Sequence, residues 1–352
     1  MEAKQTIRAS IIVVNYNSWP DIQRCLESLI RVNYKNDEII VVDNGSSDGS
    51  VERIASLFPQ VVLLQNNRNL GFGGANNLGA QIARGRYLAF LNPDTEVAPD
   101  WLDALIDELE REPEVGLVTS KILLLGDRER INTCGNDVHL TGLTLCRGTG
   151  RPATEMSANE DVSAVSGAAF AIRATSFHAL EGFDEVFFLY MEDTDLSLRA
   201  ALAGYRIRCV PESVVYHDYT LRFGPAKTYF QERNRYMMLL KTMRWPTLIL
   251  LIPALLLAEI ITWGFVLLRD RPHWTNKFRA YGYVVRHWSS LMARRKQTQA
   301  LRTVPDRQLM ARMHFRLDFE QADRGIAAKG AHLIFDPLFY VWRRLMLGVV
   351  RW

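Results

Sequence analysis

Residues 38–50 read EIIVVDNGSSDGS, and the order of residue types in this stretch decides the fold. The apolar, β-branched run predicts a buried strand that ends at Asp43. The Asn-Gly and Asp-Gly pairs that follow predict a turn, and apolar residues then recur at helical spacing through residues 49–58. A buried strand joined to a helix by a short polar turn is the first half of a parallel βαβ unit.

The same alternation continues on both sides of this stretch. It predicts strands at residues 10–15, 61–65, 87–91 and 115–121, and helices at residues 20–31, 73–83 and 100–111. Apolar strands alternating with helices predict an α/β fold with a mostly parallel sheet and helices on both faces. Ligands of such sheets bind at the carboxyl ends of the strands, so we expect the functional site there.

The middle of the chain is less regular. Residues 126–160 show no clear periodicity and are rich in Gly, Thr, Asn and Arg, which predicts a long loop. Further strands are predicted at residues 162–173, 205–210 and 213–217, and a helix within residues 187–203. We assign residues 1–225 to one globular domain and residues 226–352 to a C-terminal helical region.

The C-terminal region contains a segment suited to a membrane. Residues 247–268 are nearly all apolar over about the length that crosses a bilayer. Basic residues flank both ends, so the positive-inside rule does not favour a single crossing. We expect an in-plane or re-entrant hairpin, broken at Pro253 and Gly264, and an amphipathic helix at residues 335–352 on the membrane surface. A buried core helix is the alternative.

Composition narrows the class of protein. The chain has 352 residues, 48% of them hydrophobic and 23% charged, with a net charge of +3, so wholesale disorder is excluded. The four cysteines form no CxxC pair, which excludes a disulfide scaffold and indicates reduced thiols in the cytosol. The first residues resemble no secretory signal. We expect no nucleic-acid partner, and the oligomeric state stays open.

Two motifs follow predicted strands at the expected edge. In VVDNGSSDGS (residues 41–50), Asp43 could accept a hydrogen bond from a base, although an Asn-Gly turn with Asp48 as a helix cap explains the same residues. NLGFGGANNLG (residues 69–79) is no dinucleotide fingerprint, because Asn76 replaces the last glycine of GxGxxG. Its glycines could let the backbone approach a nucleotide sugar.

Acidic residues after two later strands could carry the chemistry. In FLNPDTEV (residues 90–97), Asp94 could hold a divalent cation against a diphosphate, and Asn92 offers a weaker amide oxygen. The alternative is an ordinary turn.

In FLYMEDTD (residues 188–195), Glu192 and Asp193 begin a helix, where acidic residues also favour the helix dipole. The aromatic lead-in would raise the basicity of a carboxylate, as a general base requires. His217 ends a strand in VVYHD, where a structural role is the alternative.

Taken together, these motifs resemble the inverting glycosyltransferases of family 2, which have the GT-A fold, over about residues 9–220. The resemblance implies that Asp43 reads the base of the donor nucleotide and that Asp193 is the catalytic base. It implies a divalent metal, Mn²⁺ or Mg²⁺, held by Asp94 and His217. The remaining residues that it implies are Asn15, Asn17, Gly71, Gly73, Asn76 and Asn92 on the donor side, and Tyr190 and Glu192 on the acceptor side.

One departure from the family pattern points to a branch. Asn92 stands where the metal motif DxD has its first acid, and the resulting NPD resembles rhamnosyltransferase-like enzymes. This resemblance implies transfer of L-rhamnose from TDP-rhamnose to a polyprenyl-diphosphate-linked saccharide, in the synthesis of bacterial O-antigen (lipopolysaccharide) or another cell-surface polysaccharide. The enzyme would act at the cytoplasmic face of the inner membrane. Galactofuranose, N-acetylglucosamine and mannose remain open as donor sugars.

Two other functions compete with this interpretation. A sugar-phosphate nucleotidyltransferase would carry a Gly-rich basic loop after the first strand, but residues 15–20 read NYNSWP. A non-catalytic sugar-binding protein on the same fold would not need Asp94, Asp193 and His217 together.

Overall fold

The computed structural model describes residues 7–32, 36–219, 225–317 and 326–352, and for residues 326–331 it describes the backbone alone. The chain divides into two compact units. The first, here called the sheet unit, contains the residues up to Gly135, Cys146–Ala200 and Tyr205–Thr220. The second, the helical unit, contains Asn136–Leu145, Ala201–Gly204 and Leu221–Trp352. The single boundary near residue 225 stays a prediction.

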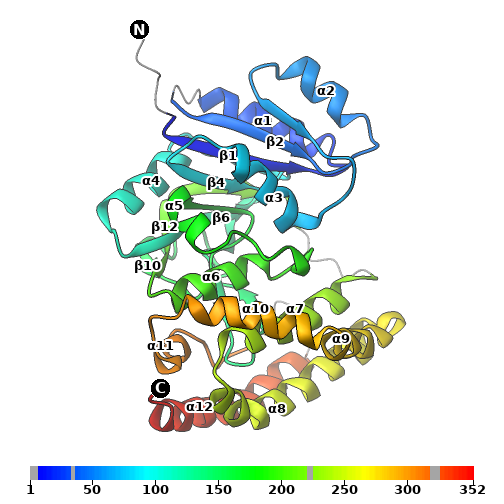
Figure 1. The fold of residues 1–352 in the computed structure, drawn as a ribbon, viewed down its shortest axis with the longest axis vertical. Coiled ribbons are helices and arrows are strands. Elements are labelled where there is room, and N and C mark those ends of the chain that lie inside the picture. The colour runs from blue at the N-terminus through cyan, green and yellow to red at the C-terminus, as the bar shows by residue number, and fades with distance from the viewer. Residues whose placement is uncertain (1–6, 33–35, 220–224, 318–325) are drawn as a thin grey trace. The chain divides into compact units, whose positions relative to one another are not determined.

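A mixed sheet forms the centre of the sheet unit (Figure 1). Along its main path the strands lie in the order β10-β12-β6-β11-β4-β1-β2-β3, while β5 pairs with β12 and β7 pairs with β6. Their bounds are β1 Ala9–Asn15, β2 Glu38–Asp43, β3 Val62–Gln65, β4 Tyr87–Leu91, β5 Thr95–Val97, β6 Val115–Leu124, β7 Asp127–Thr133, β10 Glu160–Asp161, β11 Ala169–Arg173 and β12 Arg206–His217. The pairs among β1 to β4 are parallel, whereas β11 runs antiparallel to both neighbours. The α/β fold is therefore confirmed.

Helices cover both faces of this sheet. They are α1 Asp21–Val32, α2 Ser50–Leu57, α3 Gly71–Ile82, α4 Trp101–Arg111, α5 Ala174–Ala179 and α6 Glu192–Leu202, with a 3-10 turn, η1, at Glu185–Phe187. Ile11 and Val13 share one core with apolar residues of α1 and α4, whereas Ile12 meets Gly79 of α3. Alternate residues of a strand point to opposite faces, which explains why these strands are apolar without interruption.

The predicted loop at residues 126–160 is wrong in part. Its first residues form β7, which pairs with β6, and its last residues include β10. A separate two-stranded sheet joins β8 Asn136–Val138 to β9 Thr144–Cys146. The two strands predicted at residues 205–217 are one strand, β12, whose pairing with β6 shifts register between Val210 and Val214. Polar edge strands lack the apolar alternation that predicts strands.

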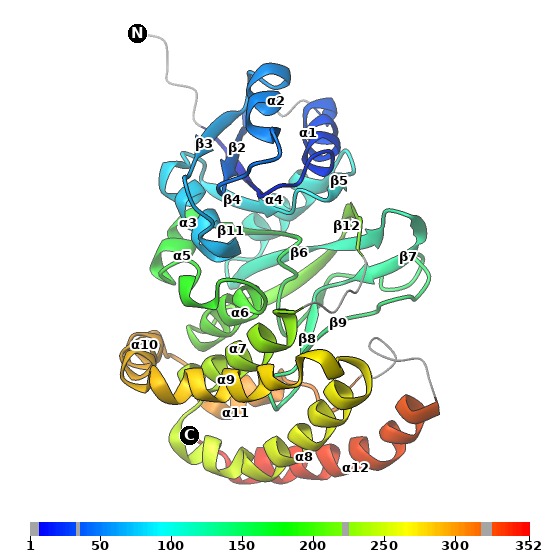
Figure 2. The ribbon, with the colours of Figure 1, turned by 90° about the vertical axis from the view of Figure 1, so that its right-hand side faces the viewer.

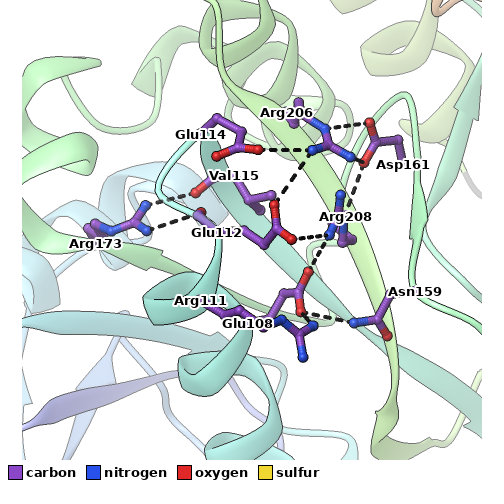
Figure 3. A network of polar contacts seen from close by, with 10 residues as sticks. All are labelled: Glu108, Arg111, Glu112, Glu114, Val115, Asn159, Asp161, Arg173, Arg206 and Arg208. Carbon is purple, nitrogen blue, oxygen red and sulfur yellow. Dashed lines mark hydrogen bonds and ion pairs between the residues drawn. The ribbon is translucent and has the colours of Figure 1, made fainter.

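A charged network secures the start of β12 (Figure 3). Arg208 donates to Glu108 of α4 at 2.6 Å and to Asp161 of β10 at 3.2 Å. Arg206 lies 2.8 Å from Asp161 and 3.2 Å from Glu114. Both Glu108 and Arg208 are buried, and pairing removes most of the penalty of burying a charge. This network holds the strand end opposite to the one that carries His217.

The helical unit consists mainly of helices (Figure 2). They are α7 Lys227–Thr242, α8 Trp245–Arg269, α9 Thr275–Arg286, α10 Trp288–Ala300, α11 Asp306–Ala311 and α12 Ile326–Val349, with a 3-10 turn, η2, at Arg271–His273. Within the described residues, α8 is the one helix that is long and apolar enough to cross a membrane.

The predicted break of this segment into a hairpin is wrong. Helix α8 continues through Pro253 and Gly264 without interruption. A proline inside a helix removes one backbone hydrogen bond, and here Leu251 and Ala254, on either side of Pro253, are both fully buried in one core. This packing offsets the loss of that hydrogen bond.

Candidate active site

The carboxyl ends of β1 and β2 bring two predicted donor-side residues together. Asn15 and Asp43 are register partners, and Asn15 Nδ2 donates to Asp43 Oδ1 at 2.8 Å and to Ser50 Oγ at 2.7 Å. Asp43 Oδ2 accepts from the backbone N–H groups of Gly45 and Ser46, both at 3.1 Å. An ionised carboxylate has about four acceptor positions, so Asp43 retains capacity for a ligand N–H.

Asn17 lies in the segment that follows β1. It has a left-handed backbone conformation with φ of 49°. Its Oδ1 accepts from Ser47 N at 2.7 Å, and its own N donates to Ser46 Oγ at 3.0 Å. These contacts tie the segment after β1 to the turn after β2, and both Asn17 and Tyr16 remain exposed.

The glycine motif opens α3 and packs against the segment that leads into α6. Gly71 has φ of +76°, and a Cβ there would lie 2.2 Å from the backbone oxygen of Phe188. Phe72 N donates to that same oxygen at 2.8 Å. A Cβ at Gly73 would approach Phe183 and, at 3.9 Å, Cβ of Glu192. These glycines therefore let the acidic motif approach the first turn of α3.

Asn76 is placed differently from the other residues of this motif. Its side chain is buried, and Nδ2 donates to Phe72 O one turn earlier in α3. This contact within the helix accounts for Asn76 without a ligand. A donor-side role remains a proposal for Gly71 and Gly73, whose backbone lies at the start of the helix.

The acidic pair begins α6. Three residues before it, Phe188, Tyr190 and Met191, have positive φ, a strained conformation that clusters at functional sites. Asp193 Oδ2 accepts from Gly167 N at 2.7 Å, and Oδ1 accepts from Thr194 N at 2.6 Å. Burial raises the pKa of Asp193. Burial also raises the pKa of the Tyr190 phenol, and the nearby carboxylate of Glu192 raises it further.

Glu192 differs from its neighbour in its surroundings. It is 7% exposed, and its shielded Oε2 has no hydrogen-bond partner among the described residues. Burial, together with the charge of Asp193, raises the pKa of Glu192 to about 8. Hydrogen bonds to a carboxylate favour its charged form. Asp193 receives such hydrogen bonds from Gly167 and Thr194, whereas Glu192 Oε2 receives none from the described residues, so Glu192 is the member of the pair that holds a proton more readily.

The predicted metal residues meet at one end of the short ladder between β5 and β12. Thr95 of β5 and His217 of β12 are register partners, and Asp218 N donates to Asp94 O at 2.9 Å. His217 Nε2 lies 3.2 Å from Asp94 Oδ1. Backbone pairing therefore brings together two side chains that are far apart in the sequence.

A buried amide fixes the orientation of the histidine. His217 Nδ1 lies 2.9 Å from Asn132 Oδ1 of β7, which can only accept, so Nδ1 carries the hydrogen. When the ring is neutral, Nε2 presents a lone pair to Asp94 Oδ1 at 3.2 Å. Two acceptors at this distance repel each other unless a cation or a proton lies between them.

These donors fit a divalent cation. Asn92 Oδ1 is also shielded from solvent and accepts no hydrogen bond from the described residues. Mixed oxygen and imidazole donors suit Mn²⁺ at least as well as Mg²⁺. No cluster of three His, Cys, Asp or Glu residues that could hold a metal occurs in the described part of the chain.

One short segment links the acidic pair to the metal residues. Gly167 N donates to Asp193, and the next residue, Ala168, accepts at its backbone oxygen from Asn92 N at 2.9 Å. Sequence reasoning missed Asn132, Gly167 and Phe188. Asn132 lies in the predicted loop, and the other two act through backbone atoms, which leave no residue-type signal.

Comparisons with known proteins identify the family to which the chain is similar. The family model for glycosyl transferase family 2 matches residues 10–138, and that for glycosyl transferase family group 2 matches residues 87–294, which is more than half of the chain. An N-acetylglucosaminyl-diphospho-decaprenol L-rhamnosyltransferase of Mycobacterium tuberculosis (strain CDC 1551 / Oshkosh) is 29% identical over 229 residues, 59% of this chain and 75% of that protein.

Two further similarities extend the comparison. The O-antigen biosynthesis protein RfbC of Myxococcus xanthus is 30% identical over 228 residues, which are 61% of this chain and 18% of that protein. The crystal structure of GalNAc-T7 with UDP, GalNAc and Mn²⁺ matches with a TM-score of 0.56 and 21% identity, over 67% of this chain and 48% of that chain. This last similarity shows a GT-A-like fold. The family matches and the fold together establish that this chain belongs to glycosyl transferase family 2.

Proposed function

We propose that this protein transfers a sugar from a nucleoside diphosphate to a lipid-linked saccharide, with inversion at the anomeric carbon. The observation that carries the proposal is the link through Gly167 and Ala168. It holds the half-buried Asp193 next to the turn that carries Asn92 and Asp94. A base and a diphosphate site must flank one reacting carbon in such a transfer.

Asp94 and His217 are the residues that would hold a divalent cation, with Asn92 as a weaker oxygen donor. When bound, such a cation neutralises the charge that develops on the departing diphosphate. The imidazole is held in place by Asn132. A metal ligand that is fixed in this way binds more tightly than a mobile one.

Asp193 accepts the proton of the acceptor hydroxyl as that oxygen attacks the sugar. Its raised pKa makes it a stronger base than an exposed aspartate. Three hydrogen bonds from Gly167 N, Thr194 N and Thr194 Oγ1 fix the carboxylate in place. A single displacement from the face opposite the leaving group inverts the anomeric centre.

We further propose L-rhamnose from TDP-rhamnose as the donor and a polyprenyl-diphosphate-linked saccharide as the acceptor. Support comes from the mycobacterial relative, which is named for both this sugar and a lipid-linked acceptor. Similarity to an O-antigen biosynthesis protein supports a role in surface polysaccharide synthesis. Such an acceptor requires the enzyme at a membrane, and cytosolic nucleotide sugars require the cytoplasmic face.

The test is incubation of the purified protein with TDP-rhamnose and a panel of UDP and GDP sugars, with a polyprenyl-diphosphate saccharide, in Mn²⁺ or in EDTA. We expect release of a nucleoside diphosphate and an acceptor extended by one sugar of inverted configuration. Release of pyrophosphate would instead identify a nucleotidyltransferase. Donor binding without any product would identify a sugar-binding protein.

A further inference from the structure

Helix α8 presents a continuous apolar stripe to solvent. Its members are Ile249, Ile252, Leu256, Ile260 and Leu267, whose exposed fractions lie between 49% and 63%. Their spacing of three, four or seven residues places them on one side of the helix. The opposite side is buried through Leu251, Ala254 and Ala258. Exposure of so many large aliphatic side chains in one stripe marks an interaction surface.

Helix α12 presents a second stripe of the same kind. Its members are Ile334, Leu338, Val341, Leu345 and Val349, whose exposed fractions lie between 47% and 61%. These residues also recur at three- and four-residue spacing. Phe339 and Met346 lie on the buried side of this helix, and Val350, directly after it, is buried in the same core.

The two stripes belong to one surface of the helical unit. Helices α8 and α12 bury their opposite sides in the same core, which contains Leu251, Ala254 and Phe339. Trp342 Nε1 donates to Leu250 O at 3.1 Å, and Trp352 Nε1 donates to Thr247 Oγ1 at 2.9 Å. Both views show the helices side by side (Figures 1 and 2). We call the ten exposed residues the α8–α12 face.

The single acidic residue of α8 is held away from this face. Glu259 pairs with Lys277 of α9 at 2.9 Å and with Arg235 of α7, both of which are buried. Tyr236 and Tyr281 also donate to it. If α8 crossed the membrane, Glu259 would lie near the middle of the bilayer together with its partners Arg235 and Lys277. Charged groups are costly at that depth. An α8 that lies in the membrane plane leaves this cluster inside the protein.

The exposed charged side chains that the structure describes in the helical unit are positive. Every Asp and Glu side chain that the structure describes in this unit is buried or half-buried. Its exposed cationic residues are Arg244, Arg269, Arg271, Arg279, Arg286, Lys296, Arg307, Arg316, Arg344 and Arg351. A second copy of this unit would bring like charges together, whereas an anionic lipid surface complements them.

We propose that the α8–α12 face docks on a membrane containing anionic lipid, with both helices lying in the membrane plane. The inference deepens the proposed function by naming the surface that brings the enzyme to a lipid-linked acceptor. The apolar stripes enter the boundary between headgroups and acyl chains, as in other interfacial helices. Exposed arginines such as Arg344 and Arg351 contact phosphate headgroups.

The first test measures binding of the full chain to phosphatidylcholine vesicles with and without phosphatidylglycerol. We expect binding that requires phosphatidylglycerol and weakens with salt. The double variant Leu256→Gln/Val341→Gln should weaken it at least about ten-fold. Leu57→Gln is the matched control, because Leu57 is 55% exposed but lies in α2 of the sheet unit. Unchanged binding of the double variant, or no binding by the unaltered protein, would overturn the proposal.

The second test measures how deeply α8 enters the bilayer. Ile249→Cys, Leu256→Cys and Leu267→Cys variants, in a Cys146→Ser background, are labelled with bimane and quenched by brominated lipids. Cys25, Cys134 and Cys209 are buried and should not react. In-plane docking predicts the same shallow depth at all three positions. A probe at position 256 near the bilayer centre, with the other two near opposite surfaces, would establish a crossing and refute the inference.

A third measurement separates this inference from the proposed function. Transfer to a short-chain, water-soluble acceptor analogue should be equal in the Leu256→Gln/Val341→Gln variant and the unaltered protein. Loss of vesicle binding with retained transfer supports both ideas. Vesicle binding without any transfer contradicts the proposed function alone.

Discussion

His217 Nδ1 and Asn132 Oδ1 lie 2.9 Å apart at the buried end of β12, so the amide determines which ring nitrogen faces Asp94. Replacing Asn132 with Ala should leave the ring free to rotate and weaken Mn²⁺ binding by about 10- to 100-fold, as loss of such a partner does elsewhere. Calorimetry with Mn²⁺ and a nucleoside diphosphate measures this directly. Asn159→Ala is the control, since Asn159 bonds to Glu108 in the network at the start of β12. Equal losses in both variants would show a general effect on folding.

The residues of the turn after β4 should differ in their effect on metal binding. Asp94→Ala removes the carboxylate that faces His217 and should weaken both Mn²⁺ binding and donor binding. Asn92→Asp adds a charge where a shielded oxygen has no hydrogen-bond partner among the described residues, so it should retain activity and bind Mn²⁺ more tightly. Titration of Mn²⁺ against activity and against calorimetric binding tests both. Full activity of the unaltered protein in excess EDTA would contradict the metal site.

The two residues of the acidic pair should not be interchangeable. Asp193→Asn keeps the shape but cannot accept a proton, so turnover should fall about 10²- to 10⁴-fold while donor binding persists. Glu192→Gln imitates the protonated form that the raised pKa favours, and should retain most activity at neutral pH. Single-turnover kinetics with donor-binding controls measure both. The reverse pattern would transfer the role of base to Glu192.

Glu192 should also impose a pH dependence on stability. Its pKa is about 8 in the folded protein and about 4.3 in an unfolded chain. Between these values the folded state binds more protons, so the free energy of unfolding should fall as pH rises from about 5 to about 8. Glu192→Gln has no such proton to lose, and its stability should fall less over the same range. Urea unfolding at several pH values tests this, and parallel curves for both proteins would contradict the buried, protonated state.

Gly71 should tolerate no side chain. Its φ is +76°, and a Cβ would meet the backbone oxygen of Phe188 at 2.2 Å. Gly71→Ala should therefore destabilise the protein by about 1–3 kcal/mol and disturb the segment before Glu192. Gly126→Ala is the matched control, because nothing lies within 4 Å of its Cβ position. Thermal unfolding and transfer activity measure the two effects. If Gly71→Ala changed neither the stability nor the activity, the segment that contains Phe188 would have to shift to make room for the added Cβ.

The sequence predicted the parts of the fold that have a strong period. The predictions of β1 and β2 are confirmed. These strands were predictable because their apolar runs end abruptly at polar turns. Strand β7, which carries Asn132, could not be found in this way. Its sequence DRERINT is exposed over its first four residues and has no apolar alternation.

The candidate site residues Asp94, Asp193 and His217 were selected because their residue types can carry the chemistry, and their catalytic and metal-binding roles stay predictions. The structure places His217 Nε2 3.2 Å from Asp94 Oδ1. The contacts of Gly167 and Phe188 are made by the backbone, so no sequence pattern records them. In α8, Pro253 was expected to break the helix, but burial of Leu251 and Ala254 in one core outweighs one lost hydrogen bond.

The ladder between β5 and β12 makes the spacing of positions 94 and 217 a property of the main chain. Side chains can therefore be exchanged at positions 92, 94 and 217 while the backbone that carries them keeps its conformation. This property makes the three positions suitable for a small combinatorial library in which each is varied among Asp, Asn, Glu and His. Selection of that library on different metals would then compare ligand chemistry at constant geometry.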